Sequence, residues 1–222
     1  MKLLNQLAII FLSGIIVSSC KKDEFQTSPL ASLKIVNTFS GSPSVKVGSR
    51  SEAIYFDGQV SLNAGSTDLY IWPEGDSLHP YLTYPKFRVN AGDVYSLFIC
   101  GDTSAPEGIL IKENLPYRTD SSAGIRFINL FANSSPLTIT LSATPTVIEV
   151  SDLAYKQYTD FKSYPGHYNS SYTFEVRDVT TPAPLPPLTT YTLDESSVPR
   201  FKNITFVILN YSGFLMMFPT YH

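Results

Sequence analysis

Residues 31–39 read Ala31-Ser32-Leu33-Lys34-Ile35-Val36-Asn37-Thr38-Phe39. Later in the chain, residues 123–131 read Ala123-Gly124-Ile125-Arg126-Phe127-Ile128-Asn129-Leu130-Phe131. The alanine, the basic residue, the asparagine and the last phenylalanine recur at matching places, with apolar residues between them. Each copy then reaches a Ser-Pro pair, which is Ser42-Pro43 in the first and Ser135-Pro136 in the second. Because such self-similarity marks a repeated structural unit, the sequence predicts two homologous halves.

Two further pairs of segments follow in the same order. Residues 68–71 match residues 173–176, and residues 94–99 match residues 203–208. The separation between matched segments grows along the chain, so we expect the second half to carry longer loops. The predicted division is a first domain over residues 31–117, a linker over residues 118–122 and a second domain over residues 123–222.

Strand signals fill both halves. β-branched and aromatic residues dominate short runs such as 33–36 and 172–176, where apolar and polar residues alternate. Turn-forming groups such as Asn63-Ala64-Gly65 separate the runs, and no stretch after residue 30 keeps a helical period for three turns. Roughly seven short strands per half are typical of an immunoglobulin-like sandwich. We therefore predict an all-β protein with two tandem immunoglobulin-like β-sandwich domains.

Asn37 and Asn129 end matching apolar strands just before the Ser-Pro segment. Their amides are expected to cap backbone groups where the chain turns, and contact with a ligand is the alternative. Cys100 lies in a strand-like apolar run, so we expect it to be a small buried residue.

These repeated pieces resemble a bacterial domain of unknown function, the family numbered 4397. The matching pieces are residues 33–43 with 63–72, and residues 125–136 with 158–176. They contain a basic-apolar-apolar-Asn strand, a Ser-Pro loop and an aromatic segment that leads to an extended strand. That family occurs in tandem copies in secreted and surface proteins. The resemblance implies a β-sandwich and implies no activity.

The N-terminal residues predict an export signal. Lys2 precedes an apolar run over residues 7–17, which is too short for the roughly 20 residues that span a bilayer. Val17-Ser18-Ser19-Cys20 resembles the bacterial lipobox, which implies cleavage before Cys20 and acyl chains on its thiol and new amine. Two or more acyl chains hold a protein stably on a membrane. We expect a signal peptide over residues 1–19 and a lipidated tether over residues 20–30; an ordinary signal peptide with an incidental cysteine is the alternative.

The residues after Cys20 indicate which side of the outer membrane the protein faces. Lys22-Asp23-Glu24 looks like the short signal that carries some Gram-negative lipoproteins to the outer face of the outer membrane. The alternative is that these residues form a polar tether and carry no sorting signal. We expect a protein that is lipid-anchored in the outer membrane and faces the cell exterior, with the periplasmic face as the other location.

Composition and motifs argue against several classes of function. The net charge is −3 and no basic cluster occurs, which argues against nucleic acid as a partner. His79, His167 and His222 do not lie at metal-ligand spacing, so we expect no metal and no cofactor. A Gly-x-Ser-x-Gly elbow and the phosphate-binding Gly loops are absent. We predict a non-catalytic protein; the alternatives are a surface hydrolase of glycans or esters with a site assembled from distant residues, and a structural spacer.

Two groups of aromatic residues are candidates for ligand binding. The first contains Tyr70 and Trp72, the single tryptophan, and the second contains Tyr155, Tyr158 and Tyr164. Exposed flat rings stack on sugar faces, and exposed tyrosines are common at protein interfaces. The expected partners are the membrane, through the acyl chains, and a glycan or another envelope protein. Packing in the core or under a loop is the alternative for both groups.

Overall fold

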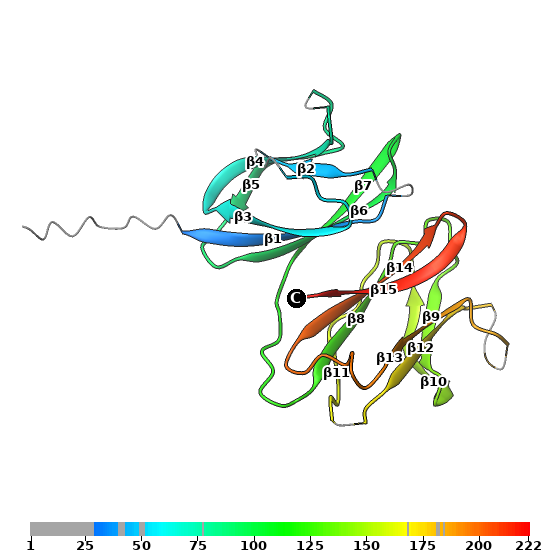
Figure 1. Cartoon of the computed structure of the whole chain (residues 1–222). Coiled ribbons are helices and arrows are strands. Elements are labelled where there is room, and N and C mark those ends of the chain that lie inside the picture. The colour runs from blue at the N-terminus through cyan, green and yellow to red at the C-terminus, as the bar shows by residue number, and fades with distance from the viewer. Residues whose placement is uncertain are drawn as a thin grey trace, which may run out of the picture.

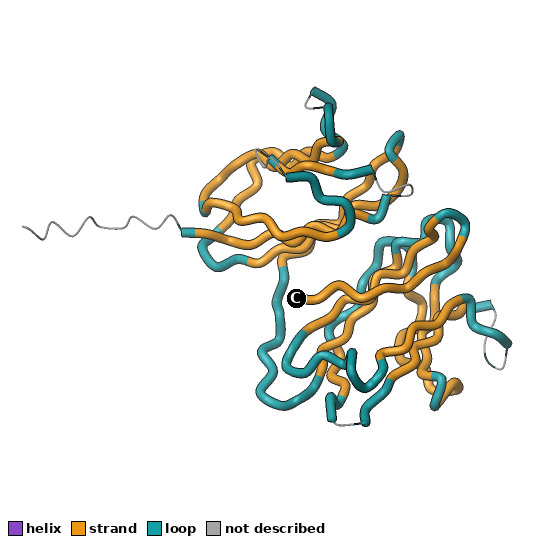
Figure 2. The backbone as a smooth tube through the Cα atoms, in the orientation of Figure 1, coloured by secondary structure: helices purple, strands orange, loops and turns teal. Residues whose placement is uncertain are grey.

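The computed structural model describes residues 29–222 except for residues 40–42, 49–51, 77, 168, 181–182 and 184. All regular structure in these residues is β-strand, and none of it is helix, as Figure 2 shows. The prediction of an all-β protein is therefore confirmed. In the same described residues, no helix could cross a membrane. Cys20 and the predicted signal peptide lie outside the described residues.

The first half contains two sheets (Figure 1). Its strands are β1 (Leu30–Asn37), β2 (Val45–Val47), β3 (Asp57–Asn63), β4 (Gly65–Pro73), β5 (Leu82–Val89), β6 (Val94–Asp102) and β7 (Ala105–Lys112). The order β3-β1-β6-β7 forms one sheet and β2-β4-β5 forms the other. β1 is antiparallel to β3 and parallel to β6.

The second half follows the same plan with one more strand. Its strands are β8 (Ala123–Asn129), β9 (Leu137–Leu141), β10 (Thr144–Leu153), β11 (Lys162–Tyr164), β12 (Tyr172–Asp178), β13 (Thr189–Leu193), β14 (Asn203–Tyr211) and β15 (Phe214–Tyr221). The sheets have the orders β11-β8-β14-β15 and β10-β9-β12-β13. β10 is the strand without a counterpart among the described strands of the first half.

The register of the parallel strands matches the sequence repeat residue by residue. Asn37 of β1 lies opposite Ile99 of β6, and Asn129 of β8 lies opposite Ile208 of β14. These are the residues that the sequence alignment of the two halves places at equivalent positions. The aligned segments therefore form the same pair of central strands in each half.

Each half has an apolar core between its two sheets. Leu33, Ile35, Ile71 and Leu97 are fully buried in the first core. In the second core, a group of aromatic rings is in mutual contact: Phe127, Phe174 and Phe206. Alternate side chains of the central strands enter the core, as expected where two sheets pack face to face.

A third apolar cluster joins the two halves. It contains buried residues of both halves: Val36, Phe98, Cys100, Ile111, Ile128, Leu130, Val207 and Leu209. These side chains belong mainly to β1 and β6 on one side and to β8 and β14 on the other, which face each other in Figure 1. The central parallel strands are therefore covered on both faces, which explains their almost continuous apolar sequence.

The recurring asparagines cap the ends of β1 and β8. The Asn37 Nδ2 donates to the carbonyl oxygens of Pro43 at 2.9 Å and Tyr55 at 3.1 Å. In the second half, the Asn129 Nδ2 donates to the Leu153 carbonyl at 2.9 Å, while its Oδ1 accepts from the backbone N–H of Phe131. Both side chains are buried, so the predicted structural role of these residues is confirmed.

Candidate functional site

Tyr70 and Trp72 lie side by side on β4. They are two residues apart on one strand, so their side chains point to the same face. Their ring centroids are 5.3 Å apart and the ring planes differ by 31°. Both side chains are partly exposed. The structure thus brings together the first pair of aromatic residues that the sequence singled out.

The two rings border an open groove of about 770 Å³ between the two sheets of the first half. One wall is formed by residues 59–63 of β3, and the other by residues 67–70 of β4 together with Trp72. Successive side chains of a strand point to opposite faces. Because consecutive residues line each wall, the groove runs along the edges of both strands and contacts their backbones.

Trp72 also borders a second hollow. This hollow has a volume of about 420 Å³ and is lined by Lys46, Gly48, Pro73, Gly75 and Asp76 in addition to Trp72. Gly48 and Trp72 belong to the linings of both hollows. The two depressions therefore adjoin at the tryptophan and offer an elongated surface rather than a closed pocket.

Asp68 supplies a fixed carboxylate beside the rings. Its Oδ1 accepts a hydrogen bond of 2.7 Å from the backbone N–H of Lys86, and its Oδ2 accepts one of 3.3 Å from the Tyr70 hydroxyl. Lys86 has a φ of 53° next to a bulge between β4 and β5, so local backbone strain accompanies this contact. The negative charge of Asp68 raises the pKa of Tyr70.

The groove has the composition of a binding surface. Flat rings stand beside hydroxyl, amide and carboxylate groups that can orient a ligand. Among the described residues that line it, Asp68 is the one carboxylate, and none is His or Cys. Tyr70 is the titratable side chain next to Asp68 in this lining, and its hydroxyl donates to that carboxylate. In the described part of the chain, no group of three or more His, Cys, Asp or Glu is placed to hold a metal ion.

The second group of predicted aromatic residues does not share one surface. Tyr155 lies where the halves meet, and its hydroxyl donates to Glu107 at 2.7 Å. Burial raises the pKa of Tyr155, and the hydrogen bond to Glu107 acts in the same direction. Tyr158 is 46% exposed, and its ring centroid lies 5.7 Å from the guanidinium carbon of Arg126. These two tyrosines therefore contribute to contacts within the molecule.

Tyr164 is part of the second core. Its side chain is buried, and its hydroxyl donates to Glu149 at 2.8 Å. The ring contacts Tyr172 and Phe174 edge-on. A buried ring offers no face to a ligand, so the structure removes Tyr164 from the candidate binding residues.

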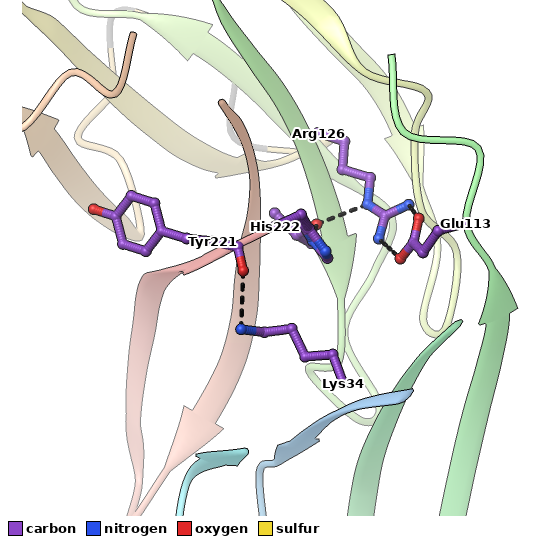
Figure 3. A network of polar contacts seen from close by, with 6 residues as sticks. Lys34, Glu113, Arg126, Tyr221 and His222 are labelled. Atoms are coloured by element: carbon purple, nitrogen blue, oxygen red, sulfur yellow. Dashed lines mark hydrogen bonds and ion pairs between the residues drawn. The ribbon is translucent and has the colours of Figure 1, made fainter. Parts of the chain in front are cut away.

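A polar network that the sequence did not predict lies between the halves (Figure 3). Arg126 of β8 and Glu113, which follows β7, form a buried ion pair, with Arg126 Nη1 donating to Glu113 Oε2 at 2.8 Å. Arg126 Nε also donates to Thr205 Oγ1 at 2.7 Å, and the Phe161 ring lies 4.5 Å from the guanidinium. The guanidinium is therefore held by charge, hydrogen bonds and a ring face.

The neighbouring contacts extend this network. The Lys34 Nζ donates to the Tyr221 carbonyl at 2.9 Å, and the His222 Nε2 lies 2.8 Å from the Thr205 hydroxyl. Lys34 and Arg126 are the basic residues that recur in the sequence repeat. A basic residue at the centre of an apolar strand needs a polar partner when it is buried. This was the feature of the sequence from which a polar contact on this strand face could have been predicted.

Comparisons of the chain with protein-family models and with curated proteins give no match.

Proposed function

We propose that this chain is a non-catalytic binding module on the surface of the outer membrane, held there by acyl chains on Cys20. In this proposal each half is an immunoglobulin-like β-sandwich domain. The equivalent sheet orders of the two halves and their separate apolar cores support the domain assignment. The lipobox-like residues 17–20 support the anchor.

The observation that carries the binding function is the groove beside Tyr70 and Trp72. The rings offer apolar faces, while two strand edges and Asp68 offer hydrogen-bonding groups. Its elongated form suits part of an extended polymer, such as a glycan chain or a segment of an envelope protein. The described lining contains one carboxylate and not the pair that glycan hydrolysis ordinarily uses, which favours binding over hydrolysis.

The test uses the protein without its signal peptide and with Cys20 replaced by alanine. It is screened on a glycan array and used to capture proteins from solubilised outer membranes. Trp72 is the single tryptophan, so its fluorescence reports directly on the groove. We expect a retained glycan or protein to change this fluorescence and to be lost with Tyr70→Ala.

Tyr117→Ala is the matched control, because Tyr117 is 91% exposed and does not line the groove. It should leave binding unchanged. Failure to retain any glycan or protein, or equal binding by the Tyr70→Ala variant, would contradict the proposed function.

The anchor is tested separately in cells. We expect radioactive palmitate to label the full-length chain and Cys20→Ala to lose the label. Protease added to intact cells should then degrade the labelled protein if it faces the exterior. Equal labelling of both proteins would rule out Cys20 as the site of acylation.

A further inference from the structure

β10 occupies a distinctive place in the second half. It pairs with β9 at the edge of one sheet. From there its Glu149 reaches β11 of the other sheet, where its Oε2 accepts hydrogen bonds from Tyr164 Oη at 2.8 Å and Lys162 Nζ at 2.5 Å. β10 therefore closes the open side of the second half, between the edges of its two sheets.

The groove of the first half lies at the equivalent place. The pair Leu33–Val60 corresponds to the pair Ile125–Lys162, because Leu33 and Ile125 are equivalent in the repeat. By the same register, Leu62 corresponds to Tyr164. Val60 and Leu62 both line the groove, whereas Lys162 and Tyr164 contact β10. β10 thus fills in the second half the space that is a groove in the first; it is hydrogen-bonded to β9 and meets β11 through side chains.

The length of the connection after β2 explains why the first half has a groove where the second half has β10. Val45 of β2 pairs with Ile54 through two backbone hydrogen bonds, as Leu137 of β9 lies opposite Leu153 at the end of β10. The chain from Val47 to Ile54 is shorter than the chain from Ile139 to Leu153, so it contains fewer residues with which to build a hairpin.

β3 also presents backbone groups to the groove. The N–H of Asn37 donates to the Phe56 carbonyl and the N–H of Ala64 donates to the Pro29 carbonyl. These bonds place the even-numbered residues of this segment toward β1, since the direction of backbone groups alternates along an antiparallel strand. Ser61 and Asn63 consequently point their backbone N–H and C=O groups away from β1. In the described part of the chain, no backbone hydrogen bond satisfies these groups on that side.

We propose that the groove takes an extended polypeptide segment of a partner protein, which adds as a strand along the free edge of β3. This inference rests on the proposed function of the groove and names its ligand. The backbone of Ser61 and Asn63 pairs with the added strand, and Tyr70 and Trp72 contact its side chains. Main-chain pairing gives such complexes their affinity, and side-chain contacts give them specificity.

The test selects peptides from a displayed random-peptide library on the immobilised protein and titrates the enriched peptides against Trp72 fluorescence. Ser61→Pro removes the outward N–H of Ser61 while leaving the hydrogen bonds to β1 in place, because proline is tolerated on the free side of an edge strand. Loss of this hydrogen bond should weaken binding by about tenfold. Ser61→Ala is the matched control, since it keeps the N–H and should bind as the wild type does.

Amide hydrogen exchange of the wild-type protein gives a second measurement that needs no variant. Bound peptide should slow the exchange of the Ser61 and Asn63 amides. The inference is overturned if no peptide is enriched, or if enriched peptides bind Ser61→Pro as tightly as Ser61→Ala and leave both amides unprotected. If the peptide inference fails but a glycan still changes Trp72 fluorescence, the proposed binding function stands. If no ligand of either kind is found, both the inference and the proposed function are overturned.

Discussion

Asn37 and Asn129 illustrate how a short polar side chain ends a buried strand. Each amide satisfies backbone carbonyls of a neighbouring segment and accepts a hydrogen bond from the backbone N–H two residues on. Apolar residues cannot replace these contacts, because buried backbone groups need partners. This explains why the same residue type stands at both positions of an otherwise variable repeat.

Asn129→Ala should destabilise the protein by about 2 kcal/mol, because it leaves the Leu153 carbonyl and the Phe131 N–H without these partners. Chemical denaturation monitored by circular dichroism measures the change. Ser134→Ala removes a single partner of the Asn129 amide and should cost clearly less. Equal stability of Asn129→Ala and the wild type would contradict the capping role.

His222 should make the stability depend on pH. Burial lowers its pKa from 6.5 to about 4; the Arg126 and Lys34 cations act in the same direction, and Glu113 opposes them. Between these two pH values the unfolded chain binds more protons than the folded chain. Stability contributed by neutral His222 is therefore present above pH 6.5 and is lost as the pH falls toward 4, by up to about 1.4 kcal/mol per pH unit.

The measurement is the free energy of unfolding of the wild type and of His222→Gln at several pH values between 4 and 7. Glutamine keeps a polar side chain without titrating in this range. The wild type should lose more stability than the variant as the pH falls. Parallel curves would show that His222 does not carry the dependence.

At the scale of elements, the repeat predicted the strands that form the centre of each half. β1, β8, β6 and β14 lie where the aligned segments predicted, because alignment compares whole strands and tolerates errors at single residues. The linker was predicted over residues 118–122, whereas the connection between β7 and β8 spans residues 113–122. Its first residue, Glu113, belongs to the contact between the halves.

The candidate binding residues were harder to predict from the sequence than the central strands. Tyr70 and Trp72 could be paired because they share a strand face, and alternation is a local property. Tyr155 lies in a turn, Tyr158 in an isolated bridge and Tyr164 in a strand, so their sequence spacing does not determine which way each points. The groove itself depends on the edges of β3 and β4 in different sheets, and no local pattern specifies that distance.

Gly124 fixes the place where the connection between the halves meets β8. A Cβ atom at this position would collide with the side chains of Arg118 and Asn203, which are hydrogen-bonded to each other at 3.0 Å. Gly124→Ala should therefore displace this pair and destabilise the protein by about 1–3 kcal/mol. Thermal unfolding measures the effect.

The double variant Gly124→Ala/Arg118→Ala provides the control. Removing the long Arg118 side chain relieves part of the collision, so the cost of Gly124→Ala should be smaller in this background. Identical costs in both backgrounds would contradict the proposed contact.

At the scale of the molecule, the halves meet through equivalent positions. Val36 corresponds to Ile128, and Cys100 corresponds to Leu209, and all four belong to the cluster between the halves. In symmetric dimers, each subunit contributes the same surface to the interface, as the two halves do here. The tandem chain thus resembles a dimer whose subunits are covalently joined, and its central parallel strands are covered on both faces.

The buried ion pair should couple the two halves in unfolding. Glu113→Ala leaves the Arg126 guanidinium buried without its charge partner, which should cost about 3–5 kcal/mol. The double variant Glu113→Leu/Arg126→Met removes both charges and should recover most of this loss. Calorimetry of the three proteins measures these changes, and a single variant as stable as the wild type would contradict this account of the interface.

The position of β1 has a mechanical consequence. β1 begins at Leu30, directly after the segment that leads back to Cys20, and it pairs with β3 along its length. Ser61 and Asn63, which hold the partner in our proposal, lie opposite Ser32 and Leu30 at the start of β1. With the proposed lipid anchor at Cys20, tension between membrane and partner would therefore enter and leave the fold at the same end of this ladder. The path of the load would be short, and most of the two halves would lie outside it.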